Sequence, residues 1–190
     1  MGGTFARHFA ILSGGTAVNM LISILTTPII TRLVEPTSYG TYSLFFLYGN
    51  IALAVFGLGL DQSLARFFYC SESDEEKASL LRYCYVLPNL VFGLASLVLV
   101  VLALCFNIVS LSNMTIVLLF IIYVFALIIN RNASVVLRLE FKSKQFALAS
   151  ILNKALFACL AIALLLFAKG LNEALALCAC CTAACYAVAI

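Results

Sequence analysis

Two charged residues inside apolar surroundings are the first candidates for chemistry in this sequence. Asp61 stands at the end of a long apolar run, and Arg131 stands inside the run 114–138. A charge at the centre of a bilayer costs ~3 kcal/mol or more, so such a residue is expected to be paired or hydrated. The two residues are expected at similar depth, which predicts an Asp61–Arg131 pair. Arginine also suits a phosphate, because its planar fork binds phosphate oxygens in pairs and stays protonated.

Three further arginines allow two interpretations. Arg32 is expected toward the outer end of the first apolar run, Arg66 near the end of the second and Arg138 at the end of the fourth. Each head group either reaches the membrane interface and anchors the chain or lines a pathway. The sequence leaves these alternatives open for all three.

Polar side chains recur on single helical faces within the apolar runs. They lie three, four or seven residues apart: Thr16, Asn19, Ser23, Thr26 and Thr27 in the first run, and Ser43, Asn50, Gly57 and Asp61 in the second. Such faces are expected either to form hydrogen bonds between helices or to line a water-filled cavity, because polar groups are costly in lipid. Asn19 and Asn50 are the costlier members to bury and are candidates for the lining of a cavity.

Pro28 interrupts the first apolar run. A proline within a helix removes one backbone hydrogen bond and clashes with the carbonyl four residues earlier, which predicts a kink. Thr26 and Thr27 are expected to satisfy part of the freed backbone. The kink is either a passive feature or a hinge for conformational change.

The elements that must position these residues are transmembrane helices. The chain is 65% hydrophobic and 10% charged, whereas a soluble domain is about half apolar and about a quarter charged. About 20 apolar residues cross the roughly 30 Å of bilayer hydrocarbon. Six segments reach this length: 9–34, 40–65, 83–107, 114–138, 146–168 and 172–190. The sequence therefore predicts an all-α membrane protein with one six-helix transmembrane unit over residues 1–190.

Basic residues indicate the orientation of these spans. With six spans, one set of connections carries or adjoins nine basic residues, and the opposite set has only Arg32 and Lys169. The nine are Arg7, Arg66, Lys77, Arg82, Arg131, Arg138, Lys142, Lys144 and Lys154. Connections rich in Lys and Arg stay in the cytoplasm, so both termini are predicted to be cytoplasmic. Because the sequence stops at Ile190 within an apolar run, we expect it to be the N-terminal part of something longer.

Several kinds of site are missing from the sequence. The one histidine is His8, the cysteines match no zinc spacing, and no carboxylate pair, glycine-rich phosphate loop or nucleophile beside a base is present. The cysteines are interpreted as small apolar residues of membrane helices. The net charge of +3 does not indicate nucleic-acid binding, because the positions of the basic residues are explained by membrane topology. We therefore predict no enzymatic activity, no metal, no cofactor and no nucleic-acid partner.

Two stretches resemble one family of membrane transporters. Residues 27–45, Thr-Pro-Ile-Ile-Thr-Arg-Leu-Val-Glu-Pro-Thr-Ser-Tyr-Gly-Thr-Tyr-Ser-Leu-Phe, look like the first helix connection of bacterial O-antigen and polysaccharide flippases. Residues 57–68, Gly-Leu-Gly-Leu-Asp-Gln-Ser-Leu-Ala-Arg-Phe-Phe, resemble their second helix and first cytoplasmic loop. These flippases belong to the multidrug/oligosaccharidyl-lipid/polysaccharide exporter superfamily.

The resemblance implies a two-lobed, alternating-access transporter of the bacterial inner membrane, to which this chain contributes the N-terminal lobe. It implies that a polyprenyl-diphosphate-linked oligosaccharide is flipped to the outer leaflet for surface polysaccharide and O-antigen (lipopolysaccharide) biosynthesis. The implied partners are this lipid-linked oligosaccharide, membrane lipids, a C-terminal lobe or a second copy, and polysaccharide polymerases. The implied binding residues are Arg32, Asp61, Arg66 and Arg131, with Asn19 and Asn50 as polar lining.

Two alternatives stay open beside this interpretation. A cation-coupled antiporter for drugs or small molecules, from the same superfamily, would need a buried carboxylate, and Asp61 is the acidic residue available for it. A non-transporting membrane scaffold or remnant would need none of these side chains for binding.

Overall fold

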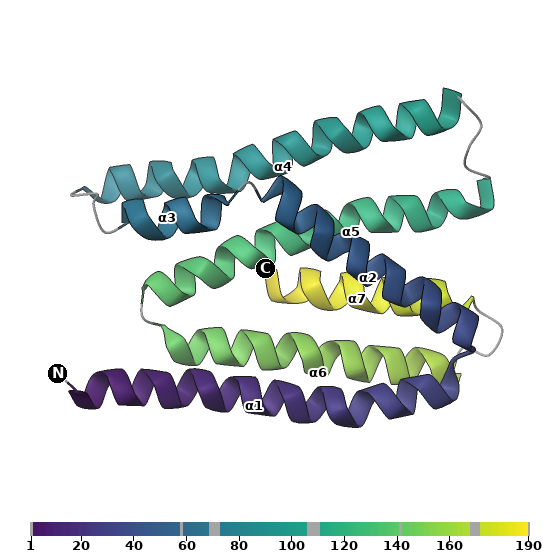
Figure 1. Cartoon of the computed structure of the whole chain (residues 1–190), viewed down its shortest axis with the longest axis horizontal. Coiled ribbons are helices and arrows are strands. Elements are labelled where there is room, and N and C mark those ends of the chain that lie inside the picture. Colours follow the sequence, from purple (N-terminus) through teal and green to yellow (C-terminus); the bar gives the residue numbers. More distant parts are fainter. Residues whose placement is uncertain are drawn as a thin grey trace.

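The computed structural model describes residues 2–57, 59–68, 73–105, 111–140, 142–167 and 172–189. Within these ranges it leaves undescribed the side chains of residues 2–8, 61, 74, 102–105, 111–113, 167 and 188–189. The described residues form α-helices and short turns, without a strand (Figure 1). The helices are α1 (Gly2–Leu33), α2 (Pro36–Phe56), α3 (Leu60–Phe68), α4 (Asp74–Cys105), α5 (Leu111–Leu139), α6 (Ser143–Phe167) and α7 (Glu173–Ala189).

Five of these helices are long and apolar enough to cross a membrane. They are α1, α2, α4, α5 and α6. The predicted all-α membrane protein is therefore confirmed. The sixth predicted span, 172–190, contains the apolar helix α7, whose 17 residues reach only about 25 Å at 1.5 Å per residue.

The second predicted span, 40–65, differs from the observed helix at both ends. The proline ring of Pro36 has the backbone angle that a first helical turn requires, so α2 begins there. The helix ends before Gly57, and Gly59 adopts a φ of 64°, in the left-handed region that favours glycine. The break makes α3 a separate short helix. The predicted polar face from α2 therefore does not continue along one helix to Asp61.

The other long helices begin earlier than their predicted spans. The clearest case is α4, which begins at Asp74 instead of residue 83. The Ser73 hydroxyl accepts a hydrogen bond from the Glu76 backbone N–H at 3.1 Å, and this cap starts the helix in a polar segment. An apolar-length criterion detects only the part of a helix that lies in hydrocarbon, so it misses such polar first turns.

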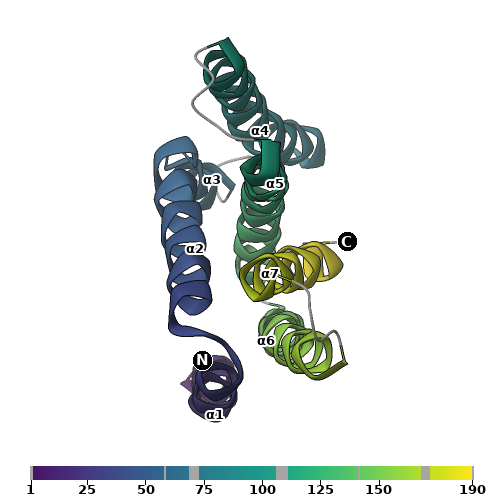
Figure 2. The ribbon, with the colours of Figure 1, turned by 90° about the vertical axis from the view of Figure 1, so that its right-hand side faces the viewer.

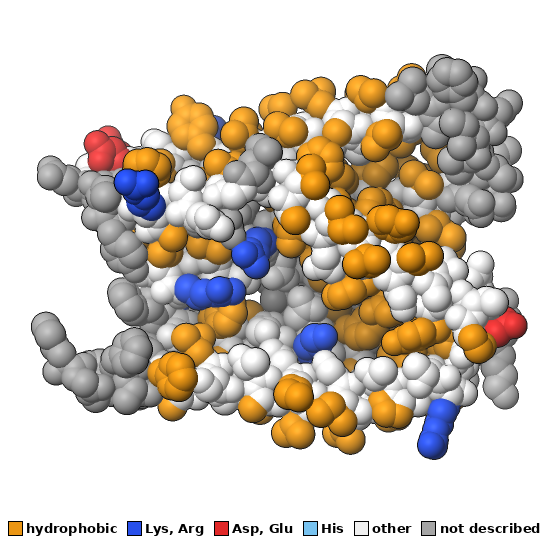
Figure 3. Space-filling model, viewed as in Figure 1, with side chains coloured by type: hydrophobic (Ala, Val, Ile, Leu, Met, Phe, Trp, Pro, Cys, Tyr) orange, Lys and Arg blue, Asp and Glu red, His pale blue; other side chains and the backbone are white. Residues whose placement is uncertain are grey.

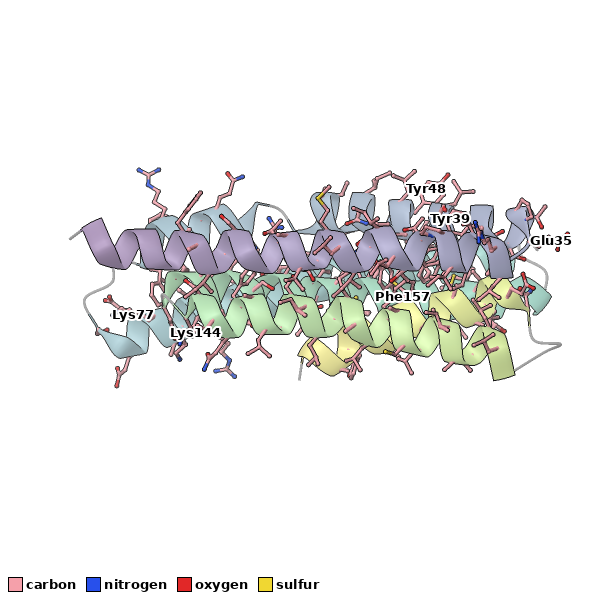
Figure 4. All side chains as sticks on the ribbon, turned by 90° about the horizontal axis from the view of Figure 1, so that it is seen from below. Glu35, Tyr39, Tyr48, Lys77, Lys144 and Phe157 are labelled. Carbon is pink, nitrogen blue, oxygen red and sulfur yellow. The ribbon has the colours of Figure 1, made fainter. Side chains whose placement is uncertain are left out.

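The two ends of the bundle differ in charge. Figure 1 shows the start of α1, the helix α3, the end of α5 and the start of α6 at one end, with the ends of α1 and α6 at the other. Figure 4 places Lys77 and Lys144 near the first end and Glu35 near the second. We call these the basic end and the Glu35 end. At the Glu35 end, the Glu35 backbone N–H donates to a carboxylate oxygen of Glu173 at 2.8 Å, which ties the α1–α2 turn to α7.

Helix α7 is packed into the centre of the bundle. It contacts α5, α6 and α2, while α1 contacts mainly α6 (Figure 2). Tyr123 of α5 is fully buried, stacks on Phe45 of α2 with ring centroids 5.0 Å apart, and shares its cluster with Cys181 and Cys185 of α7. The thiols of this cluster are free and buried, as expected for small apolar core residues.

A close approach at Gly49 predicts the sensitivity of this core. A Cβ atom at Gly49 would overlap the ring of Tyr123, whereas a Cβ at Gly40 of the same helix meets nothing within 4 Å. We expect Gly49→Ala to lower the free energy of unfolding by about 1–3 kcal/mol, because the added methyl group would displace the Tyr123 ring from its packing against Phe45. Gly40→Ala is the matched control and is expected to be neutral or slightly stabilising. Thermal unfolding of the purified variants measures both, and an equal response of the two would contradict the packing described here.

Candidate functional site

A cavity of about 540 Å³ lies between α1, α2, α5, α6 and α7. Its volume is in the range of about 300–1,000 Å³ that is typical of small-molecule sites. All five helices contribute side chains to its wall. The site is therefore built by the tertiary fold and by no single sequence motif.

Three cationic side chains line this cavity. They are Arg131 and Arg138 of α5 and Lys154 of α6. The two arginines are seven residues apart, which places them on one face of α5. The described residues of the wall include no carboxylate. Figure 3 shows Lys and Arg side chains around the middle of this face as well as at its upper left and lower right, and acidic side chains at the two ends of the molecule.

Neighbouring polar and aromatic groups hold this region in place. The guanidinium carbon of Arg138 lies 4.4 Å from the ring centroid of Phe146, within the range of a cation–π contact between α5 and α6. The Asn130 side-chain amide donates to the Cys185 carbonyl at 3.4 Å and accepts from the Ser134 hydroxyl at 3.4 Å. The positive wall is thus backed by contacts that join α5 to α6 and α7.

Arg131 and Asn50 are the predicted site residues that lie on the cavity wall. Both also line a second cavity of about 380 Å³ between α2, α3, α4 and α5. The Asn50 side-chain amide donates to the Phe46 carbonyl of its own helix at 2.7 Å. Beside Arg131, buried Asn132 donates to the Cys84 carbonyl at 2.9 Å and joins α5 to α4. These two predicted residues therefore stand where the two cavities meet.

Arg32, Arg66 and Asn19 lie outside the walls of both cavities. Arg32 is exposed in the last turn of α1 near the Glu35 end, and Arg66 is exposed on α3. Asp61 belongs to α3, and its side chain lies outside the described residues. The Asp61–Arg131 pair therefore stays a prediction.

Asn19 forms a hydrogen bond between α1 and α6. Its side-chain amide donates to the Ser150 hydroxyl of α6 at 2.6 Å. One turn away, a Cβ atom at Gly15 would lie 2.9 Å from the Cβ of Ala147, so α1 and α6 approach closely there. The polar face of α1 was expected either to bond to another helix or to line a cavity, and Asn19 does the first. Its partner Ser150 lines the cavity.

Pro28 lies inside α1, which continues through it. The Thr26 and Thr27 hydroxyls donate to the carbonyls of Ile22 and Ser23, at 2.6 and 2.8 Å. Because Pro28 has no backbone N–H, the Ile24 carbonyl four residues earlier lacks its helical donor. The expected compensation by these threonines is therefore wrong, and the hinge role of Pro28 stays a prediction.

Lys154 is a wall residue that sequence reasoning assigned to topology alone. It lies inside the predicted span 146–168, on the same helical face as Ser150 and Phe157, which also line the cavity. A lysine on a polar face well inside a span was the signal available for it. Arg138, whose role the sequence left open, belongs to the same wall.

Comparison with known proteins gives one match. A family model described as polysaccharide biosynthesis protein matches residues 5–189. No curated protein and no solved structure matches the chain.

The Asn19–Ser150 hydrogen bond gives a prediction for stability. Ser150→Ala leaves the Asn19 amide without this acceptor, and we expect the free energy of unfolding to fall by about 1 kcal/mol. Thr16→Ala on α1 is the control, because its exposed hydroxyl donates only to the Leu12 carbonyl of its own helix. Thermal unfolding in nanodiscs measures both variants. A loss for Thr16→Ala as large as that for Ser150→Ala would show that the bond between α1 and α6 has no special role.

Proposed function

The chain belongs to the polysaccharide biosynthesis protein family, and from this premise we propose that it flips a polyprenyl-diphosphate-linked oligosaccharide across the bacterial inner membrane. The observation that carries the proposal is the cavity between membrane-spanning helices with Arg131, Arg138 and Lys154 on its wall. Two guanidinium groups and one ammonium group match the negative charge and the many acceptor oxygens of a diphosphate.

Charge is the main obstacle in this reaction. A diphosphate and a hydrophilic glycan both lose their hydration if they enter hydrocarbon, and even one elementary charge there costs ~3 kcal/mol or more. A cationic cavity replaces part of that hydration with fixed donors. In the proposed mechanism the glycan crosses within the cavity, the prenyl tail stays in lipid, and the cavity opens alternately to the two sides.

The position of the cations gives the proposed reaction a direction. Arg138 is in the last turn of α5, and Lys142 follows in the turn to α6 at the basic end. This end is proposed to face the cytoplasm, because loops rich in Lys and Arg remain there. A substrate that enters from the cytoplasmic leaflet would then meet the positive wall first.

The two alternative functions receive less support from the wall. A cation-coupled antiporter would use a carboxylate as its coupling group, and the described lining residues provide none. A scaffold without transport activity gives no reason for three cations to line one cavity between apolar helices. Binding of an anionic substrate accounts for both observations.

Removal of the positive wall tests the proposal. We expect Arg131→Gln combined with Lys154→Gln to lower surface polysaccharide at least about tenfold, because a hydrogen bond to a charged group contributes about 1.5–3 kcal/mol. The measurement is polysaccharide export in cells whose only copy of the gene carries the changes, at matched protein level in the membrane.

Lys144→Gln is the matched control for the same helix. Lys144 is exposed on α6 and lies outside both cavities, so its replacement should leave export unchanged. Normal export by the double variant would contradict a role for the cavity cations in transport.

The proposed orientation has its own test. A protease site inserted after Glu140 lies at the basic end, and one inserted before Asn172 lies at the Glu35 end. We expect the first to be cut in inverted inner-membrane vesicles and the second only in intact spheroplasts, because basic loops remain cytoplasmic. The reverse pattern would overturn the orientation and leave the fold unaffected.

A further inference from the structure

We propose that the half of the 540 Å³ cavity nearer the Glu35 end is a binding site for uncharged sugar rings, distinct from the cationic half. This inference rests on the proposed function, because it assigns the glycan part of the lipid-linked substrate to its own subsite. It also fixes the direction in which the substrate lies, with the glycan ahead of the diphosphate.

The cavity wall changes in character along its length. Arg131, Arg138 and Lys154 are on this wall, and so are Tyr39, Tyr42 and Phe157. Figure 4 shows Tyr39 near Glu35, and it shows Phe157 between α1 and α6, on the Glu35 side of Lys144. Arg138 lies in the last turn of α5 at the basic end, whereas Phe157 follows Lys154 by about one turn of α6. The cations therefore lie toward the basic end and the group of Tyr39, Tyr42 and Phe157 toward the Glu35 end, and the two parts of the wall adjoin on α6.

The aromatic side chains form one continuous group. Tyr42 and Phe157 are stacked across the boundary between α2 and α6, with ring centroids 5.8 Å apart and planes 12° apart. The ring centroids of Tyr39 and Tyr42 are 6.2 Å apart. Phe46 of the same helix also lines the cavity, and its side chain is 44% exposed. The face of a sugar ring carries C–H groups that pack on aromatic rings, and rigid rings lose little conformational entropy on binding.

The facing wall from α1 supplies hydrogen-bond acceptors. The Ser23 hydroxyl donates to the Asn19 carbonyl at 3.0 Å, and the Thr27 hydroxyl donates to the Ser23 carbonyl at 2.8 Å. Each hydroxyl hydrogen is thus engaged within α1, while the oxygen keeps lone pairs for a donor in the cavity. Sugar hydroxyls are such donors. Aromatic surface together with acceptor oxygens matches a polyhydroxylated ring, and these residues offer a phosphate no cation.

This arrangement separates two recognition tasks. The diphosphate, which is common to all substrates of this chemical class, is held by charge, and the sugar is held by ring packing and neutral hydrogen bonds. The sugar half should therefore bind an uncharged oligosaccharide without any phosphate. Its binding should also depend little on salt, because no ion pair is involved.

Fluorescence provides a direct test, because the sequence contains no tryptophan. Phe157→Trp places a single indole in the aromatic half, and Tyr39→Trp is a second reporter in case the first variant does not fold. Tyr48→Trp is the matched control, since Tyr48 lies on α2, is 56% exposed and is absent from the cavity wall (Figure 4). The proteins are held in phosphatidylcholine vesicles, which add no indole, because alkyl glycoside detergents carry sugar head groups of their own.

Titration with maltotriose should change the emission of F157W and Y39W in a saturable way and leave Y48W unchanged. Tyr39→Leu in the F157W protein should weaken maltotriose binding about fivefold, the effect of losing one aromatic contact. No saturable response from folded F157W and Y39W, or an equal response from Y48W, would overturn the sugar site.

A charge-free wall distinguishes this inference from the proposed function. In F157W that also carries R131Q, R138Q and K154Q, maltotriose should still bind, while pyrophosphate, which should quench F157W with the native wall, should lose its effect. A maltotriose response that disappears with the cations would overturn the separate sugar site. If maltotriose binds but pyrophosphate never does, the sugar site stands and the anion-binding step of the proposed function fails.

Discussion

In hydrocarbon a polar group must find its partner within the protein, and this constraint organises the whole chain. The hydroxyls of α1 return to carbonyls of their own helix, Asn19 reaches Ser150 across to α6, and buried Asn132 reaches the backbone of α4. Three cations line a cavity instead of standing in lipid. The few polar side chains therefore lie at contacts between helices or on the cavity wall, and apolar side chains cover most of the remaining surface.

The same constraint accounts for the central position of α7. This helix is rich in alanine and cysteine, whose small side chains let it fit between α5, α6 and α2. Tyr123 and Phe45 fill the space that these small residues leave, and Gly49 admits the Tyr123 ring against α2. Packing at this centre holds the walls of the cavity apart at a defined distance, so the core and the site depend on the same contacts.

Much of the architecture was predictable from the sequence, because long apolar segments have few other structures open to them. Five of six predicted spans correspond to helices long enough to cross a membrane, and the family match confirms the resemblance read from residues 27–45 and 57–68. The end of α2 was missed because apolar length does not register a backbone break at two closely spaced glycines.

The site was harder to predict than the fold. Arg131 and Asn50 were predicted as cavity residues because burying a charge or an amide in hydrocarbon costs free energy, and both lie on the cavity wall. Lys154 was assigned to topology, and Asn19 was placed on a cavity, because the sequence does not say which neighbour a helical face meets. The aromatic wall from Tyr39 to Phe157 escaped notice entirely, since aromatic residues in a membrane span are unremarkable until tertiary packing brings two helices together.

The break between α2 and α3 gives the two helices separate packing partners. Helix α2 packs mainly on α5 and α7, whereas α3 packs on α4 and α5 through Leu64 and its neighbours. The left-handed φ of 64° at Gly59 lets the chain change direction there, because glycine has more backbone freedom than any other residue. Helix α3 therefore lies along α4 in a direction that α2 does not share (Figure 1). One continuous helix through this region would carry Arg66 onward along the axis of α2 instead of placing it on α3.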